Sequence, residues 1–174
     1  MSKKICILYI DTNGFNTNDQ EVSTKNLYYF DRLIAIHYSI GTYTDQYTEI
    51  KRVNTIIKPD TISFNTEAIK LHKISYEEAN KNGIVNSIVI QQLKDDLKDI
   101  DCIISYNLSY QIKSIQVECF RSAISIDFSK YSLIDIGEQY SIPNTKFSDI
   151  MKKLKIKKSN TYLDDLIQVF FKLL

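Results

Sequence analysis

Asp11 is the first side chain in this sequence whose type and position suit metal-dependent chemistry. It ends the stretch ICILYID, whose apolar and β-prone residues predict a buried central strand. Such a strand delivers its last side chain to the edge of a sheet, where divalent ions are commonly held for phosphoryl chemistry. A site of that kind needs a second carboxylate nearby, but the residue two positions on is Asn13. The stretch therefore predicts where a site lies and leaves its metal ligands incomplete.

The elements that position Asp11 follow from patterns along the chain. Residues 5–13, 33–41 and 47–59 predict three strands of an antiparallel meander. Further elements expected are helices over 84–98, 106–123, 144–156 and 160–174, and strands over 101–105 and from 131. The helix over 84–98 is expected to face the sheet with its apolar residues Ile84, Ile88, Leu93 and Leu97. The order predicts an α/β fold, a mixed sheet of antiparallel and then parallel strands flanked by helices.

Two short helices are expected between the third strand and residue 84. Asn65 or Thr66 is placed to cap the first. Ser75 starts the second, with Glu78 three residues on as a capping box.

Composition bounds the class of protein. At 174 residues, with 44% hydrophobic and 25% charged residues, the chain suits one soluble domain over 1–174. No apolar run approaches the roughly 20 residues of a membrane span, and no signal peptide is recognisable. We therefore expect an intracellular, cytoplasmic protein with no membrane contact. The cysteines predict buried thiols, because they are widely spaced within apolar patterns: Cys6, Cys102 and Cys119.

The charge distribution is more informative than the total. A net charge of +1 gives no argument for a polyanionic partner. The segment KKLKIKK (Lys152–Lys158) concentrates five lysines, which suits a phosphate backbone but more often forms a solvated helix end. The richness in Lys, Ile, Asn and Tyr is typical of low-GC genomes, as in many large DNA viruses, AT-rich bacteria and protists. A viral origin would place the protein in the host cytoplasm.

The ordered landmarks resemble the DEDDh 3′–5′ exonucleases, of the proofreading-subunit and RNase T type, whose fold is related to RNase H. The matching segments are YIDTNGF, KP…I…EAIKLHKIS, IISYNLSYQIKSIQVECFR and NTYLDDL, which together cover essentially the whole chain. The resemblance implies an RNase H-like sheet. It also implies two divalent ions about 4 Å apart between four carboxylates, with a histidine as general base.

Position by position, the resemblance leaves this chain two of the four acids. Asp11 matches the first aspartate and Asp165 the last. Neutral amides stand at the other positions, Asn13 for the glutamate, Gln111 for the middle aspartate and Asn160 at or beside the histidine. Amide oxygens supply neither charge nor strong ligation. We therefore expect no metal cofactor, or a single weakly held Mg²⁺ or Mn²⁺ at Asp11 and Asp165.

The remaining matches concern the walls of the site. Asn107 matches the family's asparagine, whereas Tyr106 and Tyr110 replace its histidine and phenylalanine. His72 fits a structural histidine, with Lys73 in place of the glycine that follows it. The candidates for contact with a nucleic acid strand are Tyr106, Asn107, Tyr110, Lys152, Lys153 and Lys155. The alternative for the two tyrosines is packing at the sheet edge.

Other acids are weaker candidates for replacing the missing ligands. Asp164 neighbours Asp165 on a predicted helix and so points about 100° away. Asp19 and Glu21 lie in a predicted loop that the sequence does not constrain. His37, inside the second strand, is expected to be a packed or half-buried residue.

Two functional hypotheses follow. The first is an inactive or severely impaired exonuclease-fold protein that serves as a binding or scaffold subunit in a replication, transcription or RNA-processing assembly. Its partners would be proteins, docked for example on the apolar segment VFFKLL (Val169–Leu174), and single-stranded DNA or RNA. Protein partners are favoured because there is no basic excess. The alternative is an active metal-dependent 3′–5′ exonuclease with a rearranged site.

Overall fold

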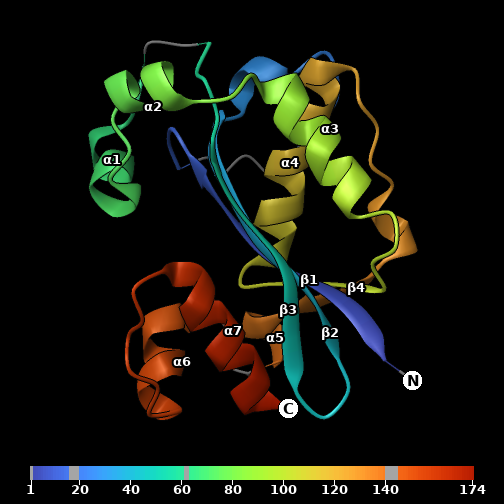
Figure 1. Cartoon of the computed structure of the whole chain (residues 1–174). Coiled ribbons are helices and arrows are strands. Elements are labelled where there is room, and N and C mark those ends of the chain that lie inside the picture. The colour runs from blue at the N-terminus through green and yellow to red at the C-terminus, as the bar shows by residue number, and fades with distance from the viewer. Residues whose placement is uncertain (1, 16–19, 61–62, 140–144) are drawn as a thin grey trace.

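A five-stranded mixed sheet forms the centre of the computed structural model, which describes residues 2–15, 20–60, 63–139 and 145–174. The strands lie in the order β3-β2-β1-β4-β5 (Figure 1). They are β1 (Lys3–Thr12), β2 (Leu33–Tyr43), β3 (Tyr47–Ile56), β4 (Cys102–Ser105) and β5 (Ser132–Asp135). The β1–β2 and β2–β3 pairs are antiparallel, whereas β1–β4 and β4–β5 are parallel. The predicted RNase H-like mixed sheet is confirmed.

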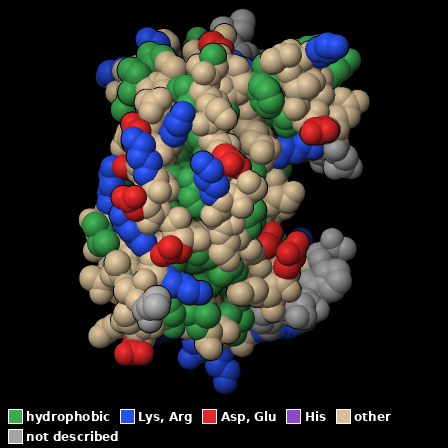
Figure 2. Space-filling view, turned by 90° about the vertical axis from the view of Figure 1, so that its right-hand side faces the viewer, with side chains coloured by type: hydrophobic (Ala, Val, Ile, Leu, Met, Phe, Trp, Pro, Cys, Tyr) green, Lys and Arg blue, Asp and Glu red, His purple; other side chains and the backbone are tan. Residues whose placement is uncertain are grey.

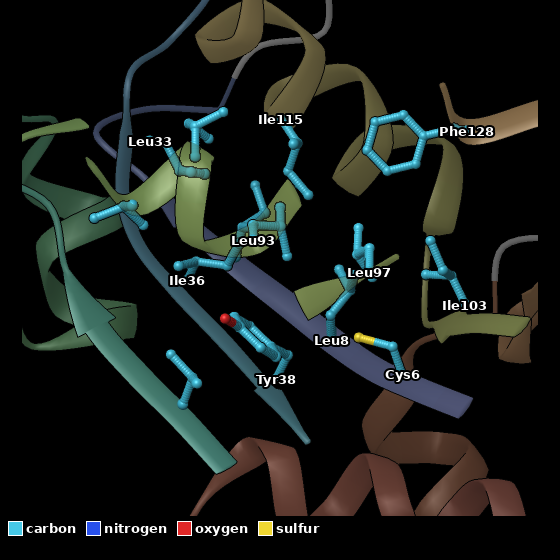
Figure 3. Close-up of a cluster of buried hydrophobic side chains, with 14 of the residues drawn as sticks. Cys6, Leu8, Leu33, Ile36, Tyr38, Leu93, Leu97, Ile103, Ile115 and Phe128 are labelled. Carbon is cyan, nitrogen blue, oxygen red and sulfur yellow. The ribbon is translucent and has the colours of Figure 1, made fainter. Parts of the chain in front are cut away.

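Helices cover both faces of the sheet because alternate residues of the central strands are apolar on both sides. On one face, Cys6 and Leu8 of β1 pack with residues of α3 (Asn86–Asp96) and α4 (Leu108–Ser122). Figure 3 shows this core, with side chains from β1, β2, β4, α3 and α4 meeting in one cluster. On the other face, Ile5 and Ile7 pack against α5 (Ile136–Gln139), α6 (Phe147–Lys153) and α7 (Tyr162–Leu173).

Two short helices lie at the end of the sheet where β1 stops (Figure 1). They are α1 (Thr66–His72) and α2 (Tyr76–Asn82). The Asn65 side chain accepts hydrogen bonds from two backbone N–H groups of α1, and Ser75 Oγ accepts one from Glu78 N. Asn65, one of the two candidates, is thus the cap of α1, and the predicted cap at Ser75 is confirmed. The single-turn 3₁₀ segments η1 (Leu27–Tyr29) and η2 (Phe128–Lys130) complete the described elements.

A buried cluster of one carboxylate and two guanidinium groups fixes the start of β2. Glu118 of α4 is fully buried, and its carboxylate accepts from Arg32 Nε at 2.9 Å and Arg121 Nη1 at 2.7 Å. It also accepts from Asn86 Nδ2 at 2.8 Å and Leu33 N at 3.2 Å. Because two guanidinium groups balance the buried carboxylate, the cluster holds α3, α4 and β2 together.

The inward face expected for the helix over 84–98 is wrong in its first part. Ile84 and Ile88 are 43% and 59% exposed. Ile84 belongs to an isolated parallel bridge with Ile57, so the helix starts only at Asn86. The buried residues of the helix are Val89, Ile90 and Leu93.

The VFFKLL segment packs on its own sheet, which corrects its expected role in docking. Val169 and Phe170 are buried, and Phe171 stacks near Tyr43 and Tyr47 with ring centroids 5.1 Å apart in both pairs. Leu174, at the end of the segment, is 63% exposed. The buried part of the segment therefore serves the core.

The buried thiols predicted from the sequence are confirmed. Each of the three cysteines is buried as a free thiol. Among the described residues, no helix has the length and apolar character that crossing a bilayer requires.

Candidate active site

Asp11 lies at the carboxyl end of β1, next to an irregularity in the β1–β2 register between Asp11 and Thr12. Its Oδ2 atom is 3.2 Å from Nε2 of His37, whose Nδ1 is 3.0 Å from Asn54 Oδ1. The His37 ring stacks on Tyr9 with centroids 4.4 Å apart and planes at 12°. As expected, His37 is half-buried, but it also occupies one of the two oxygens that Asp11 would offer to a metal ion.

The Asn13 amide is used at both ends. Its Oδ1 accepts from Arg32 N at 2.7 Å, and its Nδ2 donates to Ser63 O at 2.9 Å. The backbone N–H of Asn13 also donates to Arg32 O, and its carbonyl accepts from Asn65 N. Asn13 therefore joins the end of β1 to the start of β2 and to the segment before α1. A carboxylate could accept the first of the two side-chain bonds but could not donate the second.

Gln111 of α4 is buried and bridges the two central parallel strands. Its Oε1 accepts from Ile10 N at 2.8 Å, and its Nε2 donates to Tyr106 O at 3.3 Å. The β1–β4 ladder ends at Ile7 and Ile104, so the amide satisfies backbone groups where the strands separate. This position also requires both a donor and an acceptor, which a carboxylate does not supply.

Asp165 is buried at the first turn of α7. Its Oδ1 accepts a hydrogen bond from Ser159 N at 2.6 Å. Asp164 points elsewhere and pairs with Arg52 Nη1 at 2.7 Å. The Thr161 hydroxyl and Arg52 together lower the pKa of Asp164. Asn160 is exposed and lines a pocket of about 600 Å³ beside Arg52 and Asp164.

Aromatic rings lie close to both remaining acids. Tyr162 contacts Tyr9 edge-on at 4.9 Å and Phe147 at 4.8 Å. Burial raises the pKa of Tyr162, and the nearby carboxylates of Asp165 and Asp11 raise it further. Burial and then Asp11 likewise raise the pKa of Tyr9. Neither tyrosine was predicted from the sequence, although each shares a face with an acid. Asp11 lies two residues after Tyr9 on the strand, and Asp165 lies three residues after Tyr162 on the helix.

The arrangement of acidic, histidine and cysteine side chains bears on metal binding. Within the described ranges, no three His, Cys, Asp or Glu side chains lie so that they could hold a metal ion between them. Of the other acids considered, Asp19 lies outside the described residues, and Glu21 lines a separate groove beside α4.

The two tyrosines of the predicted strand-contact set bond within the chain. Tyr106 Oη donates to Thr145 O at 2.7 Å, and Tyr110 Oη lies 2.8 Å from Thr12 Oγ1. Burial raises the pKa of both hydroxyls. Both side chains are therefore positioned by the surrounding structure, as in the packing alternative.

Asn107 precedes α4 with a left-handed backbone, φ 55° and ψ 50°. The helix is capped from β5 by Asp135, whose carboxylate accepts from Leu108 N at 2.6 Å and Asn107 N at 3.2 Å. This cap was not predicted, because it joins residues 27 and 28 positions apart.

His72 and Lys73 end α1 near the site. His72 Nδ1 accepts from Ile74 N at 3.0 Å. Burial lowers the pKa of His72, and Asp11 and the Thr12 backbone partly offset that effect. Lys73 has a left-handed backbone with φ 65°. This conformation favours glycine, the residue that the resembling family has at this position.

Solved structures of exonuclease I share this fold. The product-bound enzyme has a TM-score of 0.73 at 12% identity, and covers 98% of this chain and 43% of its own. The exonuclease I structure that addresses processivity has a TM-score of 0.73 at 14% sequence identity. The E. coli enzyme with a dT13 oligonucleotide has a TM-score of 0.72 at 14% sequence identity. Each of these two covers 98% of this chain and 40% of its own.

The fold is that of exonuclease I. The chain spans about two-fifths of the exonuclease I chains, and at this identity the likeness establishes the fold alone. No family model and no curated protein sequence matches the chain. The predicted DEDDh-type exonuclease fold is thus supported by structure, and the chemistry depends on the site's own geometry.

The predicted lysines lie at the C-terminal end of α6 and just beyond it. Lys152, Lys153 and Lys155 are exposed, and Lys152 Nζ is 3.3 Å from Asp149. Lys155 has a left-handed backbone with φ 56°. The structure thus keeps these lysines in solvent.

Proposed function

We propose that this chain is a catalytically inactive or severely impaired exonuclease-fold protein that acts as a binding or scaffold subunit in a nucleic-acid-handling assembly. The use of the amides at Asn13 and Gln111 carries the proposal. Each amide donates one hydrogen bond and accepts another between separate backbone segments. The neutral residues are therefore part of the framework of the site, and a carboxylate at either place would lose one of its two bonds.

The remaining acids support the same conclusion. One carboxylate oxygen of Asp11 contacts His37 Nε2, and the buried carboxylate of Asp165 accepts a hydrogen bond from Ser159 N. Loss of a general base alone costs about 10²- to 10⁴-fold in rate, and loss of two metal ligands adds to that. We propose that the site holds no metal, or a single weakly held Mg²⁺ or Mn²⁺ near Asp11 and Asp165.

Nucleic acid remains one class of partner in this proposal. E. coli exonuclease I has been solved with dT13 and dA16 oligonucleotides. In this chain, Lys152, Lys153 and Lys155 are exposed for phosphate contact, as is Asn107 at the start of α4. Tyr106 and Tyr110 are tied into the structure, so the lysines are the stronger candidates. Protein partners are favoured because the net charge is only +1.

The competing function is an active 3′–5′ exonuclease with a rearranged site. It is favoured by the His37–Asp11 contact, which places an imidazole ring 3.2 Å from the first acid.

A shortening assay separates the two functions. Purified chain is incubated with 5′-labelled single-stranded DNA and RNA in Mg²⁺ or Mn²⁺. We expect no shortening above that of the Asp11→Ala variant. Shortening that is lost in Asp11→Ala would contradict the proposal and support the active enzyme.

An electrophoretic retardation assay tests the nucleic-acid role separately. A Lys152→Gln/Lys153→Gln/Lys155→Gln variant should retard single-stranded oligonucleotides less than the unmodified chain at low salt. A Lys58→Gln/Lys81→Gln/Lys130→Gln variant carries the same charge change at other exposed lysines and should behave as the unmodified chain. Absence of retardation even at low salt would assign the binding role to proteins alone.

A further inference from the structure

β5 is an edge strand with an available backbone. Among the described residues it pairs with β4 alone. Ser132 N donates to Asp101 O at 2.9 Å, so the backbone groups of Ser132 face the β4 side. Because backbone direction alternates along a strand, the N–H and C=O of Leu133 face outward. An exposed edge of this kind can accept a further strand.

A groove of about 510 Å³ runs between this edge and α4. Its apolar lining consists of Leu133 from β5, Leu108 and Ile112 from α4, and Val22 from the loop before η1. Leu133 is 46% exposed although it sits next to these side chains. The groove therefore offers an apolar strip beside an open strand edge, the arrangement in which proteins bind extended peptides.

The charged side chains of the groove are mostly acidic. Glu21, Asp135 and Glu138 line it, against Lys113. Asp135 faces the N-terminus of α4, so Glu21 and Glu138, both exposed, supply the charge at its margins. Lys113 Nζ lies over the Phe30 ring, 5.5 Å from its centroid. Figure 2 shows a hollow at its right-hand margin with acidic side chains on both sides.

We propose that the groove between β5 and α4 binds an extended segment of a partner protein that turns both apolar and basic side chains toward the groove. The segment adds to the outer edge of β5 through the Leu133 backbone. Its apolar side chains lie on Leu133 and Ile112, and its basic side chains face Glu21 and Glu138. Because successive side chains of an added strand point to opposite sides, every second residue faces the groove, and its apolar and basic side chains are therefore two residues apart.

Nucleic acid does not fit this groove, because phosphates would meet the carboxylates of Glu21 and Glu138. The groove also differs from the candidate active site, since Gln111 points into the sheet while Ile112 and Lys113 line the groove. The inference rests on the proposed binding function and gives it a place and a partner chemistry.

Fluorescence polarisation with a synthetic probe tests the groove. The probe is a fluorescein-labelled hexapeptide, Lys-Thr-Val-Thr-Lys-Thr, which carries its lysines and valine on one side of the strand, and the control peptide carries glutamate in place of lysine. We expect saturable binding of the lysine peptide at about 50 mM salt that weakens as salt rises, and no binding of the glutamate peptide. A lysine peptide N-methylated on alternate backbone nitrogens, on the side that faces β5, should also fail to bind.

Variants of the full chain locate the binding. Glu138→Lys and Leu133→Thr should each weaken the lysine peptide at least about fivefold, through charge and apolar contact respectively. Glu78→Lys on α2 makes the same charge change outside the groove and should stay within about twofold. Circular dichroism melting checks that each variant is folded, and threonine suits a strand edge at position 133.

Several results would overturn the inference. They are no binding of the lysine peptide, equal binding to Glu138→Lys and Glu78→Lys, or displacement of the peptide by a single-stranded oligonucleotide. These outcomes are distinct from failure of the proposed function, which the shortening assay detects. A chain that degrades DNA and still binds the peptide would refute the inactive site and leave the groove in place.

Discussion

Gln111 Oε1 accepts a hydrogen bond from the backbone N–H of Ile10 at 2.8 Å, and Ile10 is the residue immediately before Asp11. The same side chain donates to Tyr106 O at the end of β4. The residue that the resemblance aligns with a metal-binding aspartate is thus turned toward the backbone of the two central strands. Its amide has a structural use of its own.

Replacing Gln111 by aspartate should destabilise the fold without restoring nuclease activity. The shorter carboxylate cannot donate to Tyr106 O and leaves buried backbone groups poorly paired, which costs about 1–3 kcal/mol. Urea unfolding at pH 7 measures the loss. Gln116→Asp on the same helix corrects for helix propensity, because Gln116 lines the groove and is not buried. Equal losses in the two variants would refute this role of Gln111.

Asn13→Asp tests the second amide with almost no change in shape. The carboxylate keeps the bond from Arg32 N but places charge against Ser63 O, where the amide now donates. We expect a loss of about 1–2 kcal/mol in the free energy of unfolding, and no nuclease activity. Asn160→Asp is the control, since Asn160 is exposed, and it should change stability by less than about 0.5 kcal/mol. A stable, active Asn13→Asp chain would show that the amide is dispensable.

The sequence predicted local features well because short-range interactions determine them. The caps at Asn65 and Ser75 each depend on a side chain and backbone groups within three residues. The β1–β3 meander follows from alternating apolar residues and short connections. Leu93 and Leu97 are buried as predicted, but the first part of the α3 face was predicted incorrectly because Ile84 pairs with Ile57, a contact 27 residues away.

In the candidate site, too, local features could be predicted from the sequence and long-range contacts could not. Asp11 and Asp165 could be placed at the ends of their elements from the sequence. The His37–Asp11 contact depends on the β1–β2 register, in which His37 lies opposite Tyr9, and the sequence does not specify that register. The inward turn of Gln111 likewise depends on where the β1–β4 ladder ends. These tertiary relationships decide whether the remaining acids are available to a metal ion.

The Asp164–Arg52 pair should stabilise the fold above about pH 4. The pKa of Asp164 is lowered by the Thr161 hydroxyl and by Arg52, so its folded value lies below the unfolded value of about 4. Its stabilising contribution is therefore present above the unfolded pKa and is lost as pH falls through the folded pKa. Since both side chains are about one-third exposed, the contribution should be below about 1 kcal/mol.

Asp164→Asn removes this charge and checks the direction of the effect. Urea unfolding between pH 7 and pH 3 should show the variant less stable at pH 7, with the difference shrinking toward pH 3. A difference that does not depend on pH would show that the ion pair is not its source.

Tyr162 should contribute to stability through its ring rather than its hydroxyl. The ring contacts Tyr9 and Phe147 edge-on or tilted, and 37% of the residue is exposed. Tyr162→Ala should therefore cost about 1–3 kcal/mol, and Tyr162→Phe less than about 0.5 kcal/mol. Thermal unfolding of the two variants measures both. A large loss in Tyr162→Phe would contradict the assignment to the ring.

Metal occupancy between Asp11 and Asp165 tests the central claim most directly. Crystals of the chain soaked in millimolar Mn²⁺ are measured at an X-ray wavelength where manganese scatters anomalously. An inactive site predicts no anomalous peak beside these carboxylates, or one weak peak. Two strong peaks about 4 Å apart, with Asp11 bridging them, would contradict it and indicate a working two-ion exonuclease.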